Sequence, residues 1–246
     1  MTIKRIIVAL RWRLHRLLYR LGLPFQVHGV WVWRPPPVTP LTKQHWWSGH
    51  YERQELDLIA ANIAPADRVL ELGAGMGITT ARINRLLTDG QLTTFEASPL
   101  AHACARRTLG LNGMRNVDLR HGALTTEQVE AVPFYIADEF LVNSLLPMEG
   151  GQSVDIPAHP LEQVLEEVQP DAVVMDIEGG EYALLAHPAW KRCRNLRTLI
   201  VEFHPSDALT DGSCDLSYWF ESYSCRLNWE EIQSIRNPTT VAFRMR

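Results

Sequence analysis

Three carboxylates lie within six residues of this chain, around two glycines and directly after an apolar run at residues 172–175. They belong to Asp176, Glu178 and Glu181. If the apolar run is a strand that continues, Asp176 and Glu178 point to the same side, because side chains along a strand alternate. Burying such charges is costly unless they are paired or solvated. We therefore expect Asp176 and Glu178 to hold a cationic group, to contact a substrate or to ligate a divalent cation. Glu181 either joins the substrate site or begins the next helix, where an acid complements the helix dipole.

A second group of chemically suggestive residues surrounds a glycine turn. The apolar run at residues 69–72 leads directly into Gly73, Gly75 and Gly77, and a helical pattern follows. The next apolar run ends in Glu96, about 20 residues after the turn. A strand, a glycine turn and a helix N-terminus let the backbone approach a ligand closely, and an acid at this distance can bind ribose hydroxyls. The spacing therefore predicts a nucleoside site.

The identity of the nucleoside follows from two details of the turn. Its third glycine comes one residue earlier than in the dinucleotide pattern G-x-G-x-x-G, in which that glycine allows close helix–strand packing. An acid, Glu71, also precedes the turn and would repel a pyrophosphate. S-adenosylmethionine carries a sulfonium, an ammonium and a ribose but no phosphate. The turn therefore favours S-adenosylmethionine over NAD, and Glu71 and Glu96 argue against a turn of purely structural meaning.

Further candidates follow the other apolar runs. Ala97 comes directly after Glu96. The run at residues 117–121 leads into Gly122 and Ala123, which we expect to line an adenine pocket. The run at residues 198–203 contains Glu202 and is followed by His204. The predicted cofactor-binding residues are Glu71, Gly73, Gly75, Gly77, Glu96, Ala97, Gly122, Ala123 and Asp176.

The elements that must position these residues alternate along the chain. Strands are predicted at residues 68–73, 91–96, 117–121, 172–177 and 198–203. Helices are predicted at residues 78–87, 100–111, 161–168 and 180–186. Such alternation indicates an α/β fold with a mostly parallel sheet and helices on both faces, whose ligands bind at the carboxyl ends of the strands. Residues 239–246 predict a last, antiparallel strand. The short apolar pieces at 132–136 and 140–146 suggest a hairpin over the active-site edge.

The N-terminal part differs from the rest. We expect residues 1–50 to form an arm and residues 51–246 to form the catalytic domain. Residues 3–23 predict a basic amphipathic helix, because apolar residues recur three and four apart among arginines. Such a helix either lies on an anionic membrane surface or packs its apolar stripe on its own domain or on a dimer partner.

The remainder of the arm is aromatic. Residues 25–33 predict one strand, and residues 52–63 predict a helix that leads into the sheet. Between them, residues 41–51 are rich in aromatic side chains and histidines. His50 and Tyr51 are therefore candidates to line an acceptor pocket; the alternative is that this loop packs the arm onto the domain.

Charge and composition exclude several classes of protein. Of the 24 basic residues, eight lie before Glu52 and no acid does, so the remaining 16 share the chain with all 28 acids. An acidic catalytic part disfavours nucleic-acid binding. There is no apolar run of 18 residues, the N-terminal apolar stretch is too short for a secretory signal, and the four cysteines lack metal-site spacing. We expect a cytoplasmic protein, either free or peripheral at the inner membrane surface.

Several of these motifs together resemble the FkbM family of S-adenosylmethionine-dependent methyltransferases, over roughly residues 49–205. The shared elements are Gly49-x-Tyr51-Glu52, Leu72-Gly73-Ala74-x-x-Gly77, Phe95-Glu96-Ala97-Ser98-Pro99, Asp176-Ile177-Glu178-Gly179-Gly180-Glu181 and Glu202-Phe203-His204-Pro205. The resemblance implies a class I, Rossmann-like methyltransferase that methylates hydroxyls of sugars, glycans, glycolipids or small-molecule natural products. The competing hypothesis is a non-catalytic, membrane-associated adaptor that has kept the fold.

The resemblance also defines what a catalytic base must do. A hydroxyl has to lose its proton as it attacks the methyl group, and a positioned base contributes about 10²–10⁴-fold to such a step. Histidine titrates near neutral pH, so His204 is the first candidate, with Glu202 orienting it or acting in its place. A structural hydrogen bond to backbone is the alternative for His204. Asp176 completes the predicted catalytic set, Glu178, Glu181, His50 and Tyr51 the predicted substrate set, and no metal ligand is assigned.

Overall fold

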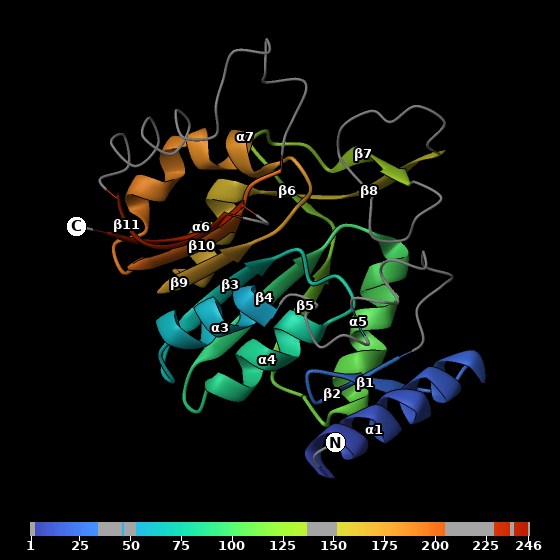
Figure 1. Ribbon diagram of the computed structural model, residues 1–246. Coiled ribbons are helices and arrows are strands. Elements are labelled where there is room, and N and C mark those ends of the chain that lie inside the picture. The colour runs from blue at the N-terminus through green and yellow to red at the C-terminus, as the bar shows by residue number, and fades with distance from the viewer. Residues whose placement is uncertain are drawn as a thin grey trace.

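The computed structural model describes residues 3–33, 46, 53–136, 152–204, 229–236 and 239–245. Within these residues the core is a seven-stranded sheet of order β11-β12-β10-β9-β3-β4-β5, in which only β12 runs against the others (Figure 1). The strands are β3 (Arg68–Leu72), β4 (Gln91–Glu96), β5 (Val117–His121), β9 (Ala172–Met175), β10 (Thr198–Glu202), β11 (Trp229–Arg236) and β12 (Thr239–Met245). The predicted parallel sheet with an antiparallel last strand is confirmed. The edge strand β11 was not predicted.

Helices cover both faces of the sheet because its central strands are apolar on both sides. The helices are α3 (Arg53–Asn62), α4 (Ile78–Leu86), α5 (Pro99–Leu111), α6 (Leu161–Val168) and α7 (Glu181–Ala186), with a 3₁₀ turn at Pro188–Arg192. Val69 packs in the cluster formed with α3 and α4, whereas its neighbour Leu70 packs in the cluster with α6 and α7. Successive residues of a strand thus pack against helices on opposite faces of the sheet, as expected for a buried parallel strand.

The strand β9 ends earlier than predicted. It stops at Met175, and Glu178 and Gly179 then adopt left-handed backbone conformations, with φ of 56° and 105°. The chain therefore turns between Asp176 and the start of α7. The sequence argument placed Asp176 and Glu178 on the same side because it assumed that the strand continues through them. The strand ends before them, so strand alternation does not explain where they point.

A smaller sheet lies beyond β5, with the order β6-β8-β7. It consists of β6 (Ala123–Thr125), β7 (Ala131–Ile136) and β8 (Gln152–Pro160), and β7 and β8 pair antiparallel. The predicted hairpin is confirmed for its first strand. Its described partner is β8, which the sequence did not predict, and the predicted second strand at residues 140–146 lies outside the described residues.

The N-terminal arm packs against the side of α4 and α5 (Figure 1). It begins with α1 (Ile3–Arg20) and continues as a hairpin of β1 (Phe25–Val27) and β2 (Val30–Val32), so the single strand predicted at residues 25–33 was wrong. The two residues between β1 and β2, His28 and Gly29, both have positive φ, as a tight two-residue hairpin turn requires. The hairpin shares one hydrophobic cluster with α4 and α5.

Of the aromatic loop at residues 41–51, only Trp46 is described, and it is buried against Phe25 and Tyr19. Trp46 also shares a hydrophobic cluster with Met76 and Ile78, so at this position the loop packs against the body; the acceptor-pocket hypothesis for its neighbours stays a prediction. His50 and Tyr51, the predicted acceptor contacts, lie outside the described residues. Of the helices that the structure describes, none combines the length and the apolar character needed to cross a membrane.

Candidate active site

The predicted site lies where the strand order reverses, between β3 and β9, which is where ligands of open α/β sheets bind. Here Gly73 follows β3 and Asp176 follows β9. A side-chain carbon added to Gly73 would overlap the carbonyl oxygen of Asp176, and the φ of Gly73 is 95°. Only glycine fits such a position, because it tolerates both the positive φ and the close backbone approach. The first glycine of the turn therefore brings the ends of the two central strands together.

Glu96 joins the loops that follow β3 and β4. One of its carboxylate oxygens accepts a hydrogen bond from the Gly75 amide at 2.7 Å, and the other accepts one from the Ser98 amide at 2.8 Å. Ser98 in turn caps α5 by accepting a hydrogen bond from the Ala101 amide. Burial raises the pKa of Glu96 to about 7, although the two amides lower it. The acid that the spacing assigned to the ribose thus lies at the end of β4, against the glycine turn.

Glu71 lies deeper than predicted. Its side chain is 1% exposed, next to the hydroxyls of Thr80 on α4 and Thr94 on β4. Burial raises the pKa of this carboxyl to about 7, although the two hydroxyls lower it. Glu71 therefore lies beneath the glycine turn, and its direct contact with a ligand stays a prediction.

The wall predicted for adenine follows β5. The amide of Gly122 donates to the carbonyl of Glu96 at 3.0 Å, which places Gly122 and Ala123 beside the end of β4. Gly122 has a φ of 129°, and a side chain there would overlap the carbonyl oxygen of Pro157. His159 of β8 also reaches this region, with its Nε2 3.0 Å from the carbonyl oxygen of His121. Sequence reasoning missed His159, because its position depends on the pairing of β6 with β8.

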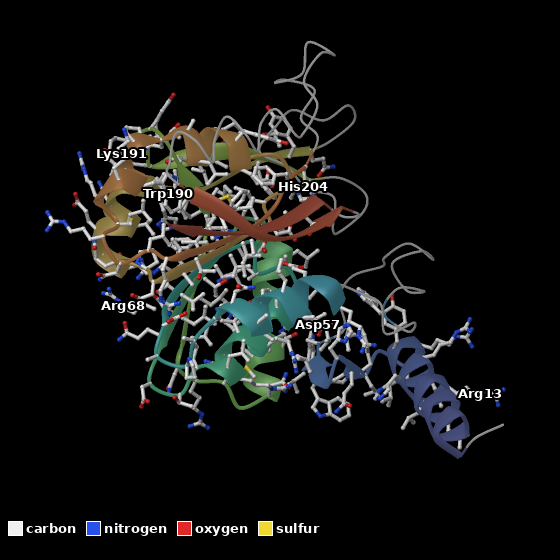
Figure 2. The ribbon with its side chains drawn as sticks, turned by 60° about the vertical axis from the view of Figure 1, so that its left-hand side comes forward. Arg13, Asp57, Arg68, Trp190, Lys191 and His204 are labelled. Carbon is white, nitrogen blue, oxygen red and sulfur yellow. The ribbon has the colours of Figure 1, made fainter. Side chains whose placement is uncertain are left out.

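Four carboxylates surround His204, which lies just after the end of β10 (Figure 2). Its Nδ1 lies 2.9 Å from Oε1 of Glu181. Its Nε2 lies 3.5 Å from a carboxylate oxygen of Glu178, 3.7 Å from one of Asp176 and 3.9 Å from one of Glu202. The structure therefore brings the three acids that follow β9 together with Glu202 and His204 at the end of β10.

Glu181 holds this arrangement in place. It is 0% exposed, and its carboxylate accepts hydrogen bonds from the amides of Ile177 and Gly179 as well as contacting His204. These bonds fix the loop between β9 and α7 and direct Nε2 of His204 towards the remaining acids. Glu181 was predicted as a substrate contact. It is fully buried and its oxygens are already bonded to two amides and to His204, so its contact with a substrate stays a prediction.

The protonation of His204 follows from its surroundings. Burial alone would lower the pKa of its imidazole, but the hydrogen bond with Glu181 and the charges of Asp176 and Glu178 outweigh it and raise the pKa to about 9. At neutral pH the imidazole is therefore protonated. Burial also raises the pKa of Asp176, whose Oδ1 is buried without a hydrogen-bond partner among the described residues, and that of Glu178.

A metal ion is geometrically conceivable at the same place. One ligand atom each from Asp176, Glu178 and His204 lie within 4.8 Å of one another, the sole such cluster among the described residues. A metal ligand must be deprotonated, so an ion would first have to displace the proton that these acids stabilise on His204. The arrangement as described suits a cation held by carboxylates, whether that cation is the imidazolium or the charged part of a ligand.

Comparison with known proteins gives a family and a fold. Residues 72–215 match the family model described as "Methyltransferase FkbM domain", a range that contains the glycine turn, Glu96, the acids after β9 and His204. No curated protein matches the chain. The crystal structure of EvdMO1 is similar with a TM-score of 0.50 and 17% identity, covering 96% of this chain and 48% of that one.

Two methyltransferase structures are similar at lower scores. A methyltransferase from Geobacter sulfurreducens has a TM-score of 0.49 and 16% identity, covering 86% of this chain and 91% of its own. A precorrin-6y C5,15-methyltransferase from Geobacter metallireducens has a TM-score of 0.47 and 12% identity, covering 79% and 89%.

Proposed function

The chain belongs to the FkbM methyltransferase family, and from this premise we propose that it transfers a methyl group from S-adenosylmethionine to a hydroxyl of a sugar, glycan or glycolipid. The observation that carries the proposal is the His204 constellation. A histidine fixed at Nδ1 by a buried glutamate and open at Nε2 to a group of acids is suited to take a proton from a hydroxyl.

The residues around the glycine turn fit a cationic cofactor. Glu71 and Glu96 are buried, and the half-buried Asp176 lies near enough for its charge to raise the pKa of both. A positive ligand would reduce the repulsion among these carboxylates, whereas a phosphate would increase it. Gly75 borders open space, because a side-chain carbon placed there meets no atom within 4 Å. We assign the ribose to Glu96 and the ammonium to Asp176; when bound, S-adenosylmethionine supplies an activated methyl group on its sulfonium.

The protein itself must supply a base that removes the proton of the acceptor hydroxyl. His204 is protonated in the ligand-free protein because Glu181, Asp176 and Glu178 support its positive charge. A positive charge held by Asp176 would compete for that support and lower the pKa of His204. The imidazole would then release its proton and become able to accept one at Nε2. Glu202, at 3.9 Å, is the nearest acid on the same strand end and would stabilise the imidazolium that re-forms.

A direct test uses S-adenosylmethionine with a labelled methyl group and a panel of acceptors. The panel contains free sugars, a glycolipid and small-molecule natural products with hydroxyls. We expect label on the sugar-containing acceptors only, with an equal amount of S-adenosylhomocysteine. Label on the natural products alone would move the acceptor to that class. No binding of S-adenosylmethionine in a calorimeter would instead support the non-catalytic adaptor.

The role of Glu181 as a positioning residue predicts a change in pH dependence. In the wild type, kcat/KM for S-adenosylmethionine, which reports the ligand-free enzyme, should rise with pH and level off above the pKa of His204, about 9, because the neutral imidazole is the base. Glu181→Gln keeps one acceptor but removes the negative charge that helps to raise this pKa, so the rising limb should move to lower pH, towards the ordinary value of 6.5. The maximal rate should fall, because one amide oxygen cannot accept all the bonds that the carboxylate makes with Ile177, Gly179 and His204.

The measurement is kcat/KM between about pH 6 and about pH 10, with Glu127→Gln as the control, since Glu127 is an exposed acid remote from His204 in the chain. The control should keep the wild-type profile. If Glu181→Gln lowers the rate but the rise of kcat/KM stays at the same pH, Glu181 stabilises the loop between β9 and α7 and does not set the pKa of His204.

A further inference from the structure

The side chains of α1 that the structure describes divide into a buried side and an exposed side. The buried side contains His15, Leu18 and Tyr19, which contact the β1–β2 hairpin and Trp46. The ring of His15 also meets that of Trp31, and its Nδ1 accepts a hydrogen bond from the amide of Gln26. These contacts fix which side of α1 faces outward.

The outward side carries a leucine stripe, formed by Leu10, Leu14 and Leu17 of α1 and by Leu21, which directly follows the helix and donates its amide to the carbonyl of Leu17. Their spacing of four, three and four residues puts them on one face of the helix. All four are between 51% and 64% exposed. Single exposed leucines are normal on soluble proteins, but a continuous apolar stripe marks a surface that contacts something else.

Exposed arginines border the leucine stripe. Arg13, Arg16 and Arg20 lie along one flank, and none of them forms an ion pair with another described residue. Arg13 points away from the body of the molecule (Figure 2). The chain contains no acid before Glu52. The surface is therefore apolar along its centre and positive at its edge.

We infer that α1 docks onto an anionic lipid surface, with the leucine stripe in the acyl boundary and the arginines at the phosphate headgroups. A helix of this pattern lies in the plane of the membrane interface, and apolar burial and attraction to anionic lipid both contribute. A second copy of α1 is a poorer occupant. It would offer these arginines no acid and would bring like charges together.

Vesicle binding of the full chain tests the inference without cofactor or acceptor, so its outcome is independent of methyl transfer. Sedimentation with phosphatidylcholine vesicles, with and without phosphatidylglycerol, should show binding only to the anionic ones. Raising the salt from about 0.1 M to about 1 M shortens the screening length from about 10 Å to about 3 Å and should weaken this binding.

Two double variants separate the contributions. Leu14→Gln with Leu17→Gln should weaken vesicle binding at least about tenfold, because the inserted apolar area is lost. Arg13→Gln with Arg16→Gln should weaken it by about fivefold for each charge. One control is Leu111→Gln, which changes a leucine 42% exposed on α5. The other is Lys191→Gln with Arg194→Gln, of which Lys191 lies at the end of the molecule opposite Arg13 in Figure 2. Both controls should bind as the wild type does.

Three results would overturn the inference. The first is a wild-type protein that does not bind anionic vesicles, and the second is equal binding by the wild type and the double leucine variant. The third is a dimer in solution that dissociates in the double leucine variant while neither protein binds vesicles, which would assign the leucine stripe to a second copy of the chain.

Discussion

Glu96→Ala is expected to weaken the binding of S-adenosylmethionine by at least about 10²-fold, to the point where calorimetry detects none. The proposed ribose contact consists of hydrogen bonds to a charged group, each of which contributes about 1.5–3 kcal/mol. The same carboxylate also ties Gly75 to Ser98, so its loss releases both loops that border the ligand. Binding and loop order would be lost together.

The control for this variant is Glu96→Gln, which keeps an acceptor for one of the two amides. We expect Glu96→Gln to bind more weakly than the wild type and more tightly than Glu96→Ala. Thermal unfolding of all three proteins shows whether the fold survives. A stable Glu96→Ala variant with wild-type affinity would remove Glu96 from the ribose site and with it the nucleoside reading of the turn.

His204→Ala should lower kcat by about 10²–10⁴-fold without weakening the binding of S-adenosylmethionine, because the ammonium assigned to Asp176 would lose a competing positive charge. In addition, His204 lies at the end of β10, where its Nε2 faces Asp176, Glu178 and Glu202, whereas the proposed ribose contact is on β4. Single-turnover rates with labelled methyl donor, together with calorimetry, separate the two effects.

The matched control is His187→Asn. His187 directly follows α7, at the end of that helix opposite Glu181. His187 accepts a hydrogen bond from the Ala189 amide at the start of a 3₁₀ turn, and asparagine can keep that bond. The control should turn over as the wild type does. Unchanged turnover of His204→Ala would exclude His204 as the base, and Glu202→Gln would then test the alternative that Glu202 takes the proton.

The local parts of the fold could be predicted because each depends on neighbouring residues. The apolar run before Asp176 predicted a strand buried on both faces, and β9 is such a strand. The arm shows where this reasoning fails. Residues 25–33 have the composition of one strand, but His28 adopts a left-handed conformation that its residue type only weakly favours. Packing of Phe25 and Val32 under α4 and α5 decides in favour of a hairpin.

The candidate site divides in the same way. The glycine turn and Glu96 were predictable, because strand length and turn chemistry fix their spacing along the chain. The convergence on His204 was not, because β9, α7 and β10 meet only through sheet pairing and the turn at Glu178. Glu181 shows the difference, since a carboxylate that begins a helix became the buried partner of a histidine 23 residues away.

The sequence by itself determined the fold class, the nucleoside signature and the amphipathic character of the first helix, because hydrophobic period and residue spacing are properties of the chain alone. Tertiary structure decided which face of α1 remains exposed, which acids surround His204 and whether that imidazole is protonated. Those properties depend on burial and on distances between segments remote in sequence, and a pKa responds to the charges that the fold brings near it.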